Sequence, residues 1–102
     1  MSASAPTFVI SQSFRVPGLG WLVLPATPAP NWLAGPTLHT ALALRLHRTG
    51  QPPLLLPATI EEISRAPEPP TRALLLDADP NGGLPVGAWL SLAPLPLAGE
   101  LV

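Results

Sequence analysis

The carboxylates and serines of this chain do not form a pattern that supports catalysis. Glu61 and Glu62 are adjacent, so on a strand their side chains point to opposite faces and cannot act together on one substrate. The serines are isolated, without the G-x-S-x-G motif of a nucleophile elbow, and the chain has no cysteine. The residues therefore predict no catalytic site, although a carboxylate brought in from another strand stays an alternative.

Metal ligands are equally sparse. His39 and His47 would lie about 27 Å apart on a strand, at ~3.4 Å per residue, or about 12 Å apart on a helix, at ~1.5 Å per residue. Neither spacing makes a local metal site, so we expect solvent-facing strand histidines. The segment 77–82 matches the first half of a calcium loop, but Ala88 stands where that loop needs a bidentate glutamate. We predict no metal and no cofactor.

Side chains suited to contact another macromolecule occur in two places. Trp32 and Leu33 lie in a proline-rich stretch, where a large aromatic side chain can pin the loop to the core and also anchor a partner. Arg45, His47 and Arg48 gather at the end of a later segment. These five residues are the candidate partner-binding residues.

Charge is scarce throughout the chain. Hydrophobic residues make up 47% of the sequence and charged residues only 11%, against roughly 25% charged in a typical soluble domain. Apolar surface gathered in patches usually marks a face for a partner or for self-association. The five basic residues are scattered arginines and the net charge is −1, so the concentrated positive field that nucleic acids require is missing.

No segment of the sequence has the pattern of a membrane span or a signal peptide. Prolines interrupt every apolar run before the ~18 residues that a span needs, and the first residues lack a basic stretch ahead of an apolar one. We expect a soluble, cytoplasmic protein that does not bind membranes.

The first third of the chain predicts a hairpin followed by a loop. Residues 7–16 alternate between apolar and polar side chains, which is the pattern of a half-buried strand. Residues 17–20 form a turn rather than a nucleotide loop, because Val23 stands where a third glycine would be needed. The apolar run 21–24 is the second strand, and the proline-rich stretch 25–36 is an extended loop.

Residues 37–48 have two interpretations. Leucines alternate with other residues at a period of two, as in a strand, but leucine, alanine and arginine are strong helix formers. A helix would spread the leucines over about 200° and bury them poorly. The sequence favours a strand here.

The second half of the chain predicts short strands separated by turns. Pro57 divides 54–64 into an apolar run and a segment in which Thr59 and Glu62 have capping-box spacing, so a short helix from Ile60 is an alternative. The remaining elements follow from local composition: an exposed connector at 67–70, a strand at 72–76, a turn at 77–83, a strand at 88–92 and a polyproline-like tail.

These elements predict one all-β domain over residues 1–102, with 1–6 and 93–102 as extended tails. About six short strands without long crossover helices are typical of a small antiparallel barrel or sandwich. We expect Trp21 and Trp89 to lie partly in its core.

Three segments, in order, resemble the translation-factor β-barrel, the second domain of elongation factor Tu type GTPases. The run 14–23 is similar to its opening hairpin, 58–63 to its Ile-Glu strand and 84–90 to its closing turn. The family often has a basic residue at the position of Leu19, and this chain has neither lysine nor a phosphate-binding loop. The resemblance implies a barrel that docks other molecules, without a GTPase active site.

The hypothesis that follows is a stand-alone interaction module that binds a protein partner or a second copy of itself. A translation- or RNA-associated accessory protein is the alternative, with Arg45, His47 and Arg48 as its contacts. An enzyme that uses a cleft between strands is a third class, and it would require converging polar groups in a pocket.

Overall fold

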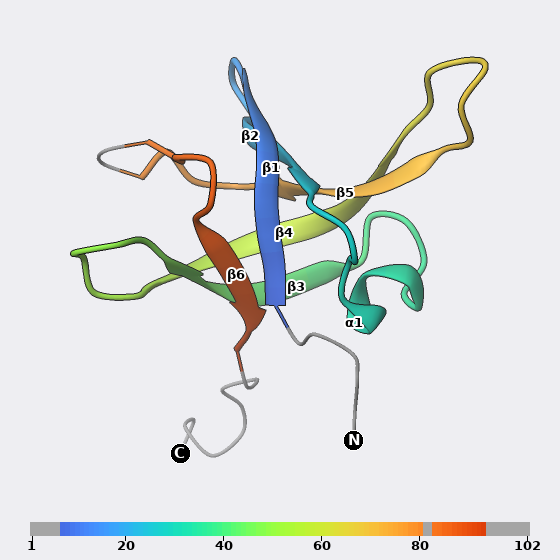
Figure 1. Ribbon diagram of the computed structural model, residues 1–102. Coiled ribbons are helices and arrows are strands. Elements are labelled where there is room, and N and C mark those ends of the chain that lie inside the picture. The colour runs from blue at the N-terminus through green and yellow to red at the C-terminus, as the bar shows by residue number, and fades with distance from the viewer. Residues whose placement is uncertain (1–6, 81–82, 94–102) are drawn as a thin grey trace.

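The chain folds into one closed antiparallel barrel. A computed structural model describes residues 7–80 and 83–93 of the 102 residues. Its elements are β1 (Thr7–Val16), β2 (Gly20–Pro25), α1 (Asn31–Ala34), β3 (Ala41–His47), β4 (Leu54–Ile63), β5 (Thr71–Leu76) and β6 (Trp89–Leu92). The strands close in the order β1-β2-β5-β4-β3-β6, and all neighbours are antiparallel (Figure 1). The prediction of a small six-stranded all-β barrel is confirmed.

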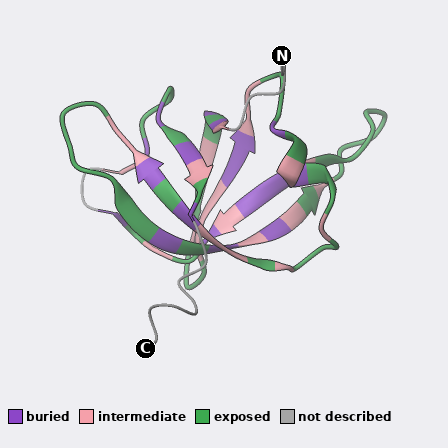
Figure 2. Cartoon of the chain, turned by 90° about the horizontal axis from the view of Figure 1, so that it is seen from below, coloured by how far each residue is buried: buried purple, intermediate pink, exposed green. Residues whose placement is uncertain are grey.

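The interior of the barrel is filled with apolar side chains. Alternate residues of each strand point inward, so buried and exposed bands alternate along the arrows in Figure 2. Among the described residues no polar or charged side chain is buried. The buried cluster contains Phe8, Ile10, Val23, Leu33, Leu44, Leu46, Leu56, Ala58, Ile60, Leu74, Leu76, Leu84, Ala88 and Leu90. The interior is therefore a packed core and not a ligand cavity.

The predicted hairpin is confirmed as β1 and β2, but the alternation along β1 changes phase. A register shift between Ile10 and Gln12 inserts a bulge opposite β2. Phe8 and Ile10 are buried before it, whereas Phe14, which has the same sequence phase, is exposed after it. One extra residue is enough to turn Phe14 outward, because side chains alternate with a period of two.

Residues 37–48 are a strand and not a helix, although the strand is shorter than predicted. β3 runs from Ala41 to His47 and pairs with β4 on one side and β6 on the other. His39 lies before β3 with a positive φ of 69°, and its N–H donates to the carbonyl of Ile60 at 2.7 Å. Leu44 and Leu46 are both buried because alternate side chains of a strand point to the same side. The strand interpretation is therefore confirmed.

The predicted break at Pro57 and the short helix from Ile60 are wrong, because β4 is continuous. The Pro57 carbonyl accepts a hydrogen bond of 2.9 Å from the Asp77 N–H, one residue beyond the end of β5. Pro57 therefore lies at the end of the β4–β5 ladder. A proline that lacks the N–H donor destabilises a sheet less at this place than in the middle of a ladder. The Thr59 hydroxyl donates to Glu61 at 2.8 Å instead of capping a helix.

The proline-rich loop contains one turn of helix that the sequence did not predict. α1 follows Pro30, and Leu33 is buried while Trp32 stacks against Phe8 at a centroid distance of 6.3 Å. Both side chains tie the loop to the core, as expected. The connector between β4 and β5 is exposed and projects from the barrel, as predicted (Figure 1).

The C-terminal third agrees with the predicted strands. β5 and β6 occupy the predicted positions to within one residue at each end. The predicted turn at 77–83 lies partly outside the described residues. The predicted polyproline tail lies almost wholly outside them. In the part of the chain that the structure describes, no helix is long and apolar enough to cross a membrane.

Candidate docking face

The outward side of β3 and β4 carries the residues with the clearest binding chemistry. Leu44, Leu46 and Leu56 point into the core, so their neighbours along each strand point out. We call the outward surface of these two strands and the adjoining ends of β5 and β6 the outer face. It consists of Ala43, Arg45, His47, Leu55, Pro57, Asp77 and Trp89.

Leu55 is the most exposed apolar side chain of this face. It is the second residue of β4, it is 63% exposed, and it lies opposite Arg45 in the β3–β4 pair. Pro57, also exposed, follows two residues later on the same side. Because the backbone of Leu55 is already held by pairing with β3, covering this side chain with a partner requires no further ordering of the backbone, so Leu55 is well placed to be an anchor.

An aromatic stack forms one side of the face. The rings of His47 and Trp89 are opposite each other on β3 and β6, parallel to within 9° and 3.7 Å apart. His47 Nε2 also lies 3.0 Å from the Ser91 hydroxyl. His47 is thus half-buried and not solvent-facing as expected, and Trp89 points out of the barrel, 38% exposed, so its predicted place in the core is wrong. The predicted place of Trp21 is confirmed, since it packs against the core.

Replacing Trp89 with alanine should lower the free energy of unfolding by about 2 kcal/mol or more, because both the ring stack and the buried part of the indole are lost. Urea unfolding of the dilute protein measures this value. Val86→Ala is the control, since that side chain is 76% exposed and its loss should change stability by less than about 0.5 kcal/mol. Equal effects of the two substitutions would mean that the stack does not stabilise the fold.

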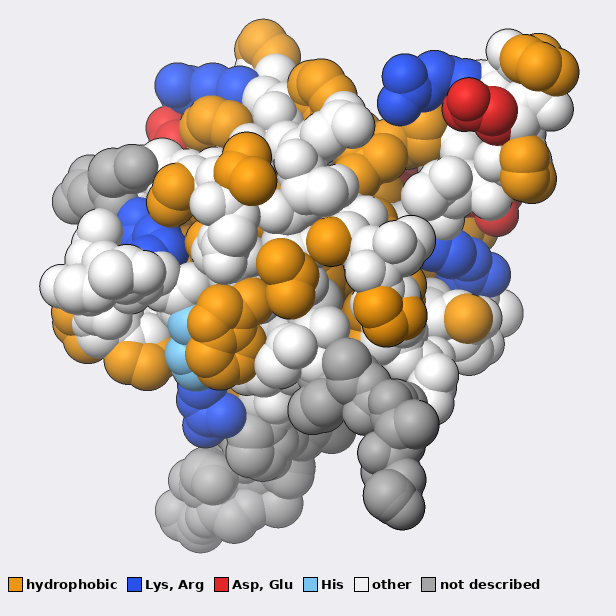
Figure 3. Space-filling view, viewed as in Figure 1, with side chains coloured by type: hydrophobic (Ala, Val, Ile, Leu, Met, Phe, Trp, Pro, Cys, Tyr) orange, Lys and Arg blue, Asp and Glu red, His pale blue; other side chains and the backbone are white. Residues whose placement is uncertain are grey.

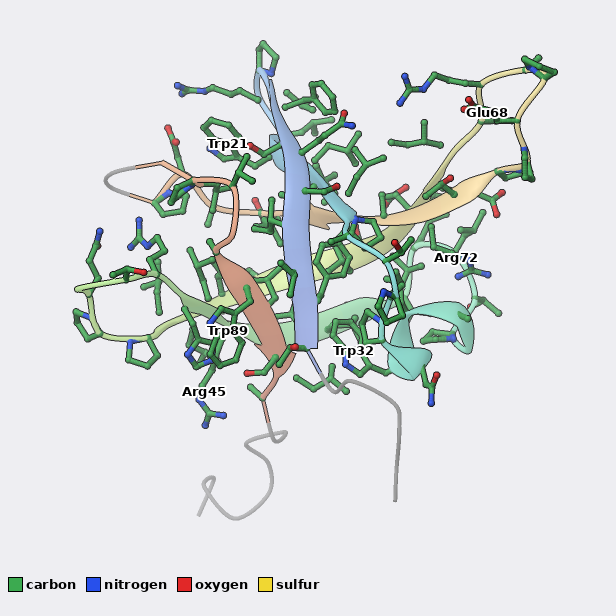
Figure 4. All side chains as sticks on the ribbon, in the orientation of Figure 1. Trp21, Trp32, Arg45, Glu68, Arg72 and Trp89 are labelled. Carbon is green, nitrogen blue, oxygen red and sulfur yellow. The ribbon has the colours of Figure 1, made fainter. Side chains whose placement is uncertain are left out.

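Arg45 differs from the neighbouring Arg48 in its contacts. The exposed Arg45 guanidinium has no hydrogen bond or ion pair with the described residues. Arg48 is half-buried, and its Nη1 donates to the carbonyl of Gly83 at 3.2 Å. Figure 4 shows Arg45 pointing away from the barrel beside Trp89. Of the predicted cluster, Arg45 and His47 share the outer face, whereas Arg48 holds a loop.

The other predicted pair does not join this face. Trp32 lies beside β1 on the opposite side of Figure 4 from Trp89. Leu33 is buried and therefore positions α1 rather than contacting a partner. Near α1 is a separate shallow groove of about 340 Å³ that includes Pro30, Ala34 and Arg72. The Arg72 guanidinium donates to the Pro36 carbonyl at 2.7 Å, so this arginine fastens the loop.

A groove continues the outer face toward the hairpin turn between β1 and β2. It measures about 370 Å³, and its lining includes Leu19, Ala41, Thr59, Leu75 and Asp77. Small side chains form much of this lining. The groove is thus a recess into which a larger apolar side chain of a partner could fit.

The remaining polar clusters have structural roles. Asp79 accepts hydrogen bonds from Arg15 at 2.8 Å and from Trp21 Nε1 at 3.0 Å, which fastens the hairpin turn to the segment after β5. Glu61 contacts His39 and Thr59. Among residues 7–80 and 83–93, no group of three potential ligands could hold a metal ion.

Comparison with protein families, with curated proteins and with solved structures finds no match. The resemblance to the translation-factor barrel thus stays a prediction from the sequence. Figure 3 adds that hydrophobic side chains are spread over the visible side of the barrel, between few charged groups. The outer face is the part of the described barrel with the clearest binding chemistry.

Proposed function

We propose that this barrel is a non-catalytic protein-interaction module that docks through its outer face. The observation that carries the proposal is Leu55, an apolar side chain that is 63% exposed although its backbone is paired with β3. Pro57 and the Trp89 stack extend the apolar surface on either side of it. Burying this surface against a partner would be favourable, at about 25 cal/mol per Å².

The distribution of polar groups supports binding rather than catalysis. The described side chains that fill the barrel interior are apolar, so no acid or base of residues 7–80 and 83–93 is buried inside it, where an enclosed catalytic site would need such groups. Asp79 lines a separate groove of about 280 Å³ at the hairpin turn, and its carboxylate is held by Arg15 and Trp21. The polar side chains of the outer face flank apolar ones, which is the arrangement of an interface rim.

A protein partner fits the face better than a nucleic acid does. Arg45 stands on the face together with a carboxylate, Asp77, and the whole chain carries a net charge of −1. Phosphate binding requires several cations along one surface. Apolar and aromatic groups with few charges are instead typical of the centre of a protein–protein interface.

Site-specific photocrosslinking in the source cells tests the proposal. Leu55 is replaced by a photoreactive phenylalanine analogue, and the control chain carries the same analogue at Val86, which is 76% exposed and lies outside the outer face. We expect crosslinks to another polypeptide from position 55 that survive nuclease treatment, and few or none from position 86.

Two results would contradict the proposal. Position 55 could give no crosslink, although the analogue at position 86 is shown to be photoreactive by its reaction with a small molecule in the medium. That result would show that the face is not covered in the cell. Alternatively, the crosslinks from position 55 could be confined to nucleic acid, which would support the RNA-associated alternative.

A further inference from the structure

The outer face carries two charged side chains of opposite sign that have no partner within the described chain. Arg45 and Asp77 are both exposed, and neither side chain has a hydrogen bond or ion pair with another described residue. The other charges around the face are engaged: Asp79 with Arg15, and Glu61 with His39. The face therefore presents one unsatisfied cation and one unsatisfied anion.

Strand pairing sets the separation of these two charges. Arg45 is opposite Leu55, and the Asp77 N–H bonds to Pro57, two residues further along β4. Two strand spacings of ~4.8 Å and two residues of ~3.4 Å put their Cα atoms about 12 Å apart. Leu55 and Pro57 lie between them, so the face has the order cation, apolar centre, anion.

We propose that the outer face binds the outer face of a second copy of this chain in a two-fold dimer. This proposal rests on the proposed function and names the partner. In a two-fold interface, residue i of one copy contacts residue j of the other, and j contacts i. A face with one cation and one anion on either side of an apolar centre matches itself under this rule.

The arrangement makes two equivalent ion pairs and covers the apolar centre. Arg45 of each copy meets Asp77 of the other, while Leu55 and Pro57 of both copies pack between the two pairs. The groove beside Asp77 and Leu75 adds a recess at the margin of the contact. A face with charges of a single sign would repel its own copy, whereas Arg45 and Asp77 let each charge of one copy meet its opposite on the other.

Complementation between charge-reversal variants tests this dimer. Arg45→Asp gives a face with two anions, and Asp77→Arg gives a face with two cations. Each variant alone should raise the dimer dissociation constant about 100-fold, or tenfold for each of the two lost ion pairs. An equimolar mixture should form a heterodimer close to wild-type strength, because one of its two ion pairs is the native one and the other is restored with its signs exchanged. Sedimentation velocity of the wild type, each variant and the mixture measures this.

The controls separate the dimer from folding and from the broader function. Circular dichroism of each variant should match the wild type, since both substituted side chains are exposed. A wild-type dimer that the single variants leave intact, or a mixture that stays monomeric, would overturn the two-fold arrangement. A monomeric wild type that still crosslinks through position 55 to a different protein would overturn the dimer and leave the interaction module standing.

Discussion

Replacing Gly20 with alanine should destabilise the barrel by about 3 kcal/mol or more. Gly20 has a φ of +127° and pairs with Val16 at the start of β2. A Cβ at this position would overlap the backbone carbonyl oxygen of Leu76, and neither strand can move away without losing core contacts. Both the strained conformation and the overlap act against the folded state.

Gly18→Ala is the matched control for this substitution. Gly18 lies in the same turn with a φ of +81°, but no atom lies within 4 Å of its added Cβ. It should cost only about 1–2 kcal/mol, from the left-handed conformation alone. Urea unfolding of both variants compares the two costs. Equal losses at the two positions would show that the approach of Leu76 to Gly20 does not constrain the fold.

Leu56→Ala should lower the free energy of unfolding by about 2–5 kcal/mol, whereas Leu55→Ala should change it by less than about 0.5 kcal/mol. The two leucines are neighbours on β4, but Leu56 is 3% exposed and Leu55 is 63% exposed. Truncating Leu56 leaves a cavity in the core. Truncating Leu55 removes surface that the folded barrel already exposes.

The same pair of variants separates folding from docking. Leu55→Ala should keep the wild-type melting curve in dilute solution and weaken self-association in sedimentation velocity. Leu56→Ala should shift the melting curve. A loss of several kcal/mol in the dilute Leu55→Ala protein would mean that this side chain belongs to the core, and the docking face would lose its centre.

Most of the fold could be predicted because the alternation of leucine with smaller or polar residues is strong. Residues 41–47 have a leucine at every second position, and only a strand points Leu44 and Leu46 to the same, buried side; the turns are marked by glycine and proline. The errors have local causes. Pro57 appeared to end a strand, since the position of β5 relative to β4 is not visible in the sequence. The bulge after Ile10 and the helical turn at α1 likewise depend on tertiary contacts.

The candidate site could be predicted only in part. Arg45 and His47 follow from their position at the end of one strand, and the structure brings them together with Trp89 from β6. Leu55 and Asp77 were missed because an apolar run does not show which leucine points outward, and Asp77 appeared to be an ordinary turn residue. The pairing of β4 with β3 and β5 shows both that Leu55 points outward and that Asp77 lies beside Pro57.

Cysteine labelling in living cells tests the central claim, that the outer face is covered by another molecule. The chain has no cysteine, so Leu55→Cys and Val86→Cys each introduce one thiol. We predict that a permeant thiol reagent labels position 55 much more slowly in cells than in dilute purified protein, while position 86 reacts similarly in both. Labelling of position 55 that is as fast in cells as in dilute solution would contradict a docking role for this face.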